Sequence, residues 1–344
     1  MSKEVLKVGW LASKSGEKCF GINEFPVEGR PYRPPTWFIN GSADGPTLVV
    51  TAGVHGAEYA SIAAALDLGQ SLDPKDLRGQ VIVAPVMNMP SFRAPSIYVS
   101  PLDGQNLNRV FPGRALGAAS EQIADWVFGN VISQAEYYVD LHGGHLKALV
   151  PFTIFFRSGN DRFDQLSLEM AQVFGISYLV RSETPGSTFC AAAGAGIPSI
   201  LAEAGGQGIW TPEDVALHTD GLRRLMRYLA MIPGGAPEPL PSTLLERFLW
   251  LRSEHEGFWY PGVAVGEEVR AGQELGRVTD YEGRVLQQAI SPADGRVLFI
   301  VSSLAINDTA TFSGRRLNVS RVADHVACFR ASRARESKTK ADAV

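Results

Sequence analysis

Between residues 47 and 230 the sequence alternates between short apolar runs and segments with a helical repeat. Several of the runs are apolar on both faces, which is typical of strands buried in a sheet that helices cover. The alternation therefore predicts an α/β domain with a largely parallel or mixed sheet. The predicted strands are 47–53, 80–88, 136–142, 152–156 and 198–204.

The segments between these runs carry helix signals. One has apolar residues at the spacing of a single helix face. A second opens with Ser120 as a candidate N-cap, and a third opens with Thr211 as N-cap, Pro212 at the first helical position and Asp214 three residues after the cap. The predicted helices are 59–68, 120–132 and 211–232.

The chain of 344 residues is longer than one typical domain of roughly 100–200 residues. The composition of the sequence changes at 232–242, where four prolines indicate a linker. Beyond this point, short β-like pieces alternate with glycine turns, which predicts a small all-β domain. We expect an α/β domain over 1–231, a linker over 232–244, a β domain over 245–330 and a disordered tail over 331–344.

Charge and composition exclude several classes of function. The formal charge is −4, the pI is about 5.9 and no basic stripe is present, so nucleic acid is not expected as a partner. The sequence has no apolar run of about 18 residues and no signal-peptide core, so we expect no membrane span. The three scattered cysteines favour neither disulfides nor a cysteine metal site, so we expect a reducing, cytoplasmic location, and we expect Cys190 to pack as a small hydrophobe.

A histidine and a glutamate stand three residues apart where the first predicted strand ends, in "GVHGAE". Near the first turn of a helix such side chains share a face, so His55 and Glu58 can converge on one cation. Catalytic zinc uses nitrogen and oxygen donors, with three protein ligands and a water. His142 is the best third candidate because it also ends a predicted strand, where sites in α/β sheets gather. The alternative is that Glu58 only favours the helix amino terminus.

Two further carboxylates stand near these strand ends. Asp140 lies two residues before His142 and is a candidate acceptor for an imidazole N–H. Glu203 follows the apolar run of the strand 198–204 and precedes two glycines, a place that core packing does not explain. Glu203 is therefore a candidate general base for a metal-bound water, with a solvated strand-end glutamate as the alternative.

The loop "PLDGQNLNRVFPG" places an amide beside a guanidinium, at Asn108 and Arg109. Arginine binds a carboxylate with two parallel hydrogen bonds, and an asparagine adds a further donor. The pair is thus a candidate site for a substrate carboxylate. The alternative is a loop arginine that pairs with a structural acid.

Four motifs, "GVHGAE", "NLNRVFPG", "DLHGG" and "LAEAGG", occur in this order over the α/β part. Together they resemble the succinylglutamate desuccinylase/aspartoacylase family, which are zinc hydrolases related to the M14 carboxypeptidases. The resemblance covers residues 40–330 and implies a carboxypeptidase-like fold, one zinc ion per chain and hydrolysis of a small N-acyl amino acid. It implies zinc ligands at His55, Glu58 and His142, a water-activating base at Glu203, and a substrate-carboxylate pair at Asn108 and Arg109.

One departure from this pattern concerns the scissile carbonyl. Aspartoacylase-like members carry another arginine before the Asn–Arg pair, where this chain has Tyr98, with Arg93 further upstream. The surrounding sequence is more similar to bacterial N-acetyl-diaminobutyrate deacetylases. Two alternatives stay open: a metallocarboxypeptidase acting on a peptide terminus, and a non-catalytic binding protein on the same fold, which the complete ligand and base set disfavours. A homo-oligomer is also left open.

The predicted β domain resembles a lipoyl or biotinyl-like sandwich. Carrier domains of that kind attach their cofactor to a lysine in a central hairpin, but the corresponding "VTDYEGRV" has no lysine. A carrier is therefore disfavoured, and we expect a structural role or a role at the edge of the site.

Overall fold

The computed structural model describes residues 5–9, 11–96, 98–245, 248–307 and 325–331. Apart from Ala331, which lies in a strand, the predicted tail 331–344 falls outside the described residues. None of the described helices combines the length and the apolar character needed to span a bilayer.

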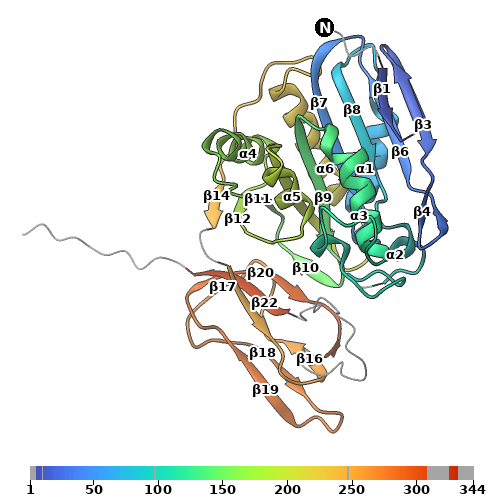
Figure 1. The fold of residues 1–344 in the computed structure, drawn as a ribbon. Helices are drawn as coiled ribbons and strands as arrows, with labels where there is room; N and C mark the ends of the chain where they lie inside the picture. Colours follow the sequence, from blue (N-terminus) through green and yellow to red (C-terminus); the bar gives the residue numbers. More distant parts are fainter. Residues whose placement is uncertain (1–4, 10, 97, 246–247, 308–324, 332–344) are drawn as a thin grey trace, which may run out of the picture.

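The predicted mixed α/β fold is confirmed (Figure 1). Within the described residues the large sheet has nine strands. The central strands pair in parallel, whereas β6 and β3 pair antiparallel at one edge and β11 pairs antiparallel with β13. In order across the sheet they are β14 (Thr243–Leu245), β12 (Tyr178–Arg181), β11 (Phe152–Phe155), β13 (Ser199–Gly206), β9 (Tyr137–Gly144), β7 (Ala43–Ala52), β8 (Arg78–Ala84), β6 (Pro35–Asn40) and β3 (Glu17–Ile22).

Helices cover both faces of this sheet, and the alternating side chains of its strands divide the core in two. In one core, Val50 and Leu141 pack with the helices α1 (Tyr59–Ser71), α4 (Asp161–Phe174) and α6 (Pro212–Tyr228). In the other core, Val49 and Tyr138 pack with α3 (Ala119–Asn130) and α5 (Thr188–Gly194). Short elements complete this part: β1 (Val5–Val8), β2 (Leu11–Lys14), β4 (Phe25–Val27), β5 (Arg30–Tyr32), α2 (Met89–Arg93), η1 (Leu107–Arg109) and η2 (Ile132–Gln134).

The helix starts test two cap predictions. Thr211 caps α6 as expected, because its hydroxyl oxygen accepts the Asp214 N–H at 3.1 Å. The Ser120 cap was wrong: α3 begins one residue earlier, and both the amide and the hydroxyl of Ser120 donate to the distant Asp103. The Glu121 carboxylate instead accepts a hydrogen bond from the backbone N–H of Ala118, the residue at the N-cap position of this helix.

The remaining described strands form two small sheets below the α/β part (Figure 1). Their own core is centred on the buried Trp259. One sheet contains β10 (Lys147–Leu149), β20 (Gly295–Val301), β22 (His325–Ala331), β15 (Phe248–Arg252) and β17 (Glu268–Val269). The other contains β19 (Val285–Ile290), β18 (Glu274–Thr279), β16 (Gly257–Pro261) and β21 (Ala305–Ile306).

The two parts are joined by backbone pairing and by apolar contact. β10 follows directly from the α/β part yet pairs antiparallel with β20. A small core brings Phe152 and Val180 of the large sheet against Leu298 and Phe299 of β20. At the other junction, β14 forms the edge of the large sheet, so the segment predicted as a linker, 232–244, ends inside that sheet.

Candidate metal centre and substrate pocket

His55 and Glu58 lie between the end of β7 and the start of α1, with Glu58 at the N-cap position. The turn passes so close to α2 that a Cβ on Gly56 would lie 2.1 Å from the Phe92 nitrogen, which explains the glycine. This path turns the two side chains together, with His55 Nδ1 2.8 Å from Glu58 Oε1. Both side chains are buried.

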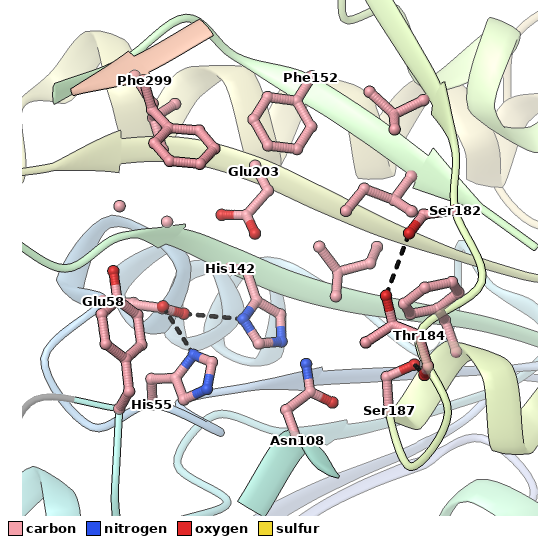
Figure 2. A pocket seen from close by; sticks show the side chains of 18 of the residues that line it. His55, Glu58, Asn108, His142, Phe152, Ser182, Thr184, Ser187, Glu203 and Phe299 are labelled. Carbon is pink, nitrogen blue, oxygen red and sulfur yellow. Dashed lines mark hydrogen bonds and ion pairs between the residues drawn. The ribbon is translucent and has the colours of Figure 1, made fainter. Parts of the chain in front are cut away.

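His142 reaches the same carboxylate from the neighbouring strand β9. Its Nδ1 atom lies 2.9 Å from Glu58 Oε2, and the three residues each offer a ligand atom within 4.8 Å of the others. Figure 2 shows both imidazoles directed at the Glu58 carboxylate. The structure thus brings together the three residues predicted as metal ligands.

The far nitrogen of each imidazole is held by a separate acceptor. His142 Nε2 lies 2.8 Å from Asp140 Oδ2, and His55 Nε2 lies 3.0 Å from Asn106 Oδ1. That asparagine oxygen also accepts the Asn108 N–H at 2.8 Å, so it is an acceptor for His55 as well. When both Nε2 atoms donate outward, both Nδ1 atoms present lone pairs to the Glu58 oxygens. Such an arrangement is stable only with a proton or a cation between them, so the residues fit a metal ion.

The electrostatics agree with a site that attracts positive charge. Burial raises the pKa of Glu58, but His55 and His142 lower it by more, so this carboxylate is ionised. Burial lowers the pKa of His142, yet Asp140 and Glu58 together raise it well above its usual range. A proton on His142 meets the same need for positive charge that a bound metal would meet.

Asp140 is the most completely enclosed carboxylate of the site. In addition to His142, it accepts hydrogen bonds from Thr51 Oγ1 at 2.7 Å and from the Thr188 hydroxyl. These donors fix the carboxylate and, through it, the orientation of the His142 ring.

Glu203 lies on β13, beside β9, and its carboxylate faces the pocket next to His142 (Figure 2). Burial and the nearby Glu58 raise its pKa to about 7, although His142 and Lys147 act in the opposite direction. A carboxyl group with this pKa can both take up and release a proton near neutral pH.

Asn108 and Arg109 lie on η1, and Asn108 lies across the pocket from Glu203 (Figure 2). The Asn108 oxygen accepts the Thr188 N–H at 2.9 Å, which leaves the amide nitrogen directed into the pocket (Figure 2). Arg109 also lines the pocket, and its Nη1 donates to the Asn108 carbonyl oxygen at 2.6 Å. The two predicted carboxylate-binding residues therefore share one pocket with the candidate metal ligands.

This pocket has a volume of about 620 Å³, and the small β part supplies some of its wall. Phe299 of β20 and Trp250 of β15 both line it. Lys147, which sequence reasoning missed, places its ammonium 4.9 Å from the centre of the Tyr98 ring and 4.8 Å from that of Phe299. The small β part thus lies at the edge of the site.

Tyr98 and Arg93 are the two candidates for the place of the arginine that aspartoacylase-like members carry before the Asn–Arg pair. Tyr98 lines the pocket, with its ring edge-on to His55 at 5.2 Å and its backbone at a φ of 56°. Arg93 is not among the described residues that line the pocket.

Cys190 lies on α5, close to but outside the pocket lining. Burial raises the pKa of its thiol, which disfavours a thiolate nucleophile. This agrees with the prediction that Cys190 is a packing residue.

The fold and the site together define an α/β protein with a buried His–Glu–His centre of the kind that metal-dependent hydrolases use. The sequence model of the succinylglutamate desuccinylase/aspartoacylase catalytic domain matches residues 44–229, and the chain belongs to this family. This confirms the resemblance drawn from the four motifs.

Individual relatives agree with this assignment. The chain is 31% identical over 261 residues to the N-alpha-acetyl-L-2,4-diaminobutyric acid deacetylase of Halomonas elongata, covering 74% of this chain and 75% of the relative. A succinylglutamate desuccinylase/aspartoacylase from Rhodobacter sphaeroides has a TM-score of 0.78 at 25% identity, covering 91% and 94% of the two chains. The product-bound ectoine utilization protein EutE (DoeB) from Ruegeria pomeroyi has the same fold, with a TM-score of 0.82 at 23% identity over 96% and 100%.

Proposed function

We propose that this protein is a zinc-dependent hydrolase that removes the acyl group from a small N-acyl amino acid. The observation that carries the proposal is the convergence of three candidate metal ligands, a candidate base and a candidate carboxylate-binding pair on one pocket. Membership of a deacylase family supports the same reaction class, hydrolysis of an amide bond.

His55, Glu58 and His142 are the residues that would hold the metal. Two imidazole nitrogens and one carboxylate are a donor set typical of catalytic zinc. When bound there, zinc supplies a Lewis acid for the acyl carbonyl and for water. Asp140 and Asn106 keep the two imidazoles oriented toward that position.

Glu203 is the proposed proton carrier. It accepts a proton from the attacking water and passes it to the nitrogen of the leaving amine, for which a pKa of about 7 is well placed. Asn108 and Arg109 bind the carboxylate of the amino acid and so hold the acyl–nitrogen bond in line with Glu203.

The first substrate to test is Nα-acetyl-L-2,4-diaminobutyrate, which the name of the Halomonas elongata relative supplies. This molecule has a carboxylate for Arg109 and an acetylated α-nitrogen for the hydrolytic centre. Its small size suits a pocket of about 620 Å³.

The test is a screen of N-acetyl and N-succinyl amino acids, dipeptides and longer peptides with the zinc-loaded protein, with release of free amine as the readout. The proposal expects hydrolysis of at least one N-acyl amino acid and none of the peptides. Hydrolysis of peptides alone would favour a metallocarboxypeptidase. Tight binding without any turnover would favour a binding protein on the same fold.

A further inference from the structure

The loop 182–187 forms one wall of the pocket and is held by its own hydrogen bonds. Ser187 donates to the Thr184 carbonyl oxygen through both its N–H, at 3.1 Å, and its hydroxyl, at 2.7 Å. The hydroxyls of Ser182 and Thr184 are 3.1 Å apart, and the Ser182 N–H donates to the Phe155 carbonyl oxygen at 3.1 Å (Figure 2). The loop is therefore a defined part of the pocket wall.

The same loop is fixed to the segment that carries Arg109. The Phe111 N–H donates to the Gly186 carbonyl oxygen at 2.9 Å. Gly186 has a φ of 81°, and a Cβ at this position would lie 2.1 Å from the Arg109 carbonyl oxygen, so only glycine fits. This contact sets the distance between the loop and the candidate carboxylate anchor.

Glu183 is the acidic residue of this loop. It lines the pocket, it is exposed, and among the described residues it has neither an ion-pair partner nor a hydrogen-bond partner. The other acids that line the pocket, Glu58 and Glu203, have proposed roles in metal binding and proton transfer. Glu183 is thus a pocket carboxylate that the hydrolytic reaction does not use.

Glu183 and Arg109 line the same pocket from two segments that pack against each other at Gly186. Burial raises the pKa of the Cys190 thiol and hydrogen bonds with Ser187 and Thr184 lower it, while Glu183 and Arg109 add smaller effects of opposite sign. The pocket therefore presents an anion and a cation on two segments that pack against each other.

An N-acyl α-amino acid matches this pair of charges in one specific way. The carboxylate and the side chain leave the same α-carbon, so a carboxylate bound by Arg109 brings the start of the side chain close to Arg109 as well. A short side chain that ends in an ammonium group then places opposite charges beside both residues. A neutral side chain leaves Glu183 without a partner, and an acidic one is repelled by it.

We infer that Glu183 binds the side-chain ammonium of an N-acyl diamino acid and selects such substrates over neutral and acidic ones. The inference rests on the proposed deacylase function and adds the charge of the side chain and the residue that recognises it.

Arg181 is the competing charge. It also lines the pocket and precedes Glu183 by two residues, so a dominant Arg181 would select acidic side chains instead. Lys147, the remaining lysine or arginine that lines the pocket within the described residues, lies between the Tyr98 and Phe299 rings. Arg181 is therefore the residue that the experiment must separate from Glu183.

The test compares kcat/KM for Nα-acetyl-L-2,4-diaminobutyrate, Nα-acetyl-L-norvaline and Nα-acetyl-L-glutamate. In Glu183→Gln the ratio of the cationic to the neutral substrate should fall about tenfold or more, as expected for losing a hydrogen bond between charged groups. Arg181→Gln should not lower this ratio. Glu238→Gln, which removes an exposed carboxylate outside the pocket, should keep the wild-type ratio.

A binding measurement separates this inference from the hydrolytic function. Calorimetry on Glu203→Gln should give tighter binding of the acetylated diaminobutyrate than of the acetylated norvaline, and adding Glu183→Gln should remove the difference. No turnover of any N-acyl amino acid by the wild type would contradict the proposed function. Equal binding of the two ligands, or a wild-type preference for the glutamate derivative that Arg181→Gln abolishes, would overturn the role of Glu183.

Discussion

His142 and Glu203 occupy paired positions on two adjacent parallel strands, β9 and β13. Residues in register on neighbouring strands point to the same side of a sheet, so backbone pairing holds a candidate metal ligand beside the candidate base. β11 pairs with the other side of β13, where Phe152 lies opposite Glu203. The position of Glu203 is therefore set by three paired strands, and replacing its side chain tests chemistry more than scaffolding.

The first prediction concerns metal content. His55→Ala and His142→Ala should each lose most of the bound zinc, because a site with three protein ligands retains little affinity with two. Elemental analysis of the purified proteins measures this. His255→Ala serves as the control, since this histidine is exposed and far from the site in the sequence. Wild-type zinc content in both site variants would remove the ligand assignment.

The second prediction concerns the residue behind His142. Asp140→Asn should lower zinc affinity by about 10–100-fold while leaving the ligands in place, because the imidazole loses the carboxylate that orients it. Competition with a chelator measures the affinity. Asp67→Asn, a change at an exposed carboxylate, should have no effect. An unchanged affinity in Asp140→Asn would mean that the ring is held by other contacts.

Much of the site could be predicted because its residues stand at strand ends. A strand that is apolar on both faces and then ends in a histidine or glutamate has few structural explanations, as at His142 and Glu203. The spacing of two residues on one strand also placed Asp140 beside His142. These are local patterns, and the sheet needs only its regular pairing to bring them together.

The rest depends on contacts between distant segments, which local patterns do not contain. Lys147 and Phe299 meet only because β10 pairs with β20, two strands that lie far apart in the sequence. Ser120 has the sequence of a helix cap but is bound by Asp103 from a preceding loop. Strands before residue 43, such as β3 and β6, escaped prediction because they add to the sheet edge without the alternation that marks its centre.

The third prediction concerns the substrate carboxylate. Arg109→Lys should raise KM for an N-acyl amino acid by about tenfold or more, although the charge is kept, because an ammonium cannot form two parallel hydrogen bonds. Steady-state kinetics with a good substrate provide the measurement. Arg162→Lys, at an exposed position on α4, is the matched control. Unchanged kcat and KM in Arg109→Lys would move the carboxylate site elsewhere.

The fourth prediction concerns pH and stability. Burial lowers the pKa of His218 from 6.5 to about 4, so between these values the unfolded chain takes up a proton that the folded protein does not. The free energy of unfolding should therefore decrease as the pH falls through this window, by at most about 1.4 kcal/mol per pH unit from this residue.

His218→Gln should make the fall in stability from about pH 6.5 to about pH 4 less steep. Urea unfolding of the zinc-free proteins at several pH values gives the comparison without a contribution from metal loss. His255→Gln, at an exposed position, should keep the wild-type slope. An identical slope in His218→Gln would show that the buried imidazole does not control this pH dependence.

The central claim is that Glu203 moves the proton in a metal-dependent deacylation, and Glu203→Gln tests it most directly. Zinc content, melting temperature and kcat are measured on one preparation. The variant should keep its zinc and its melting temperature, because the three ligands and the strand pairing are untouched. Its kcat should fall by about 10²–10⁴-fold, the usual contribution of a positioned acid–base group. A variant that keeps its zinc and turns over at a near-normal rate would contradict the role of Glu203 and the mechanism built on it.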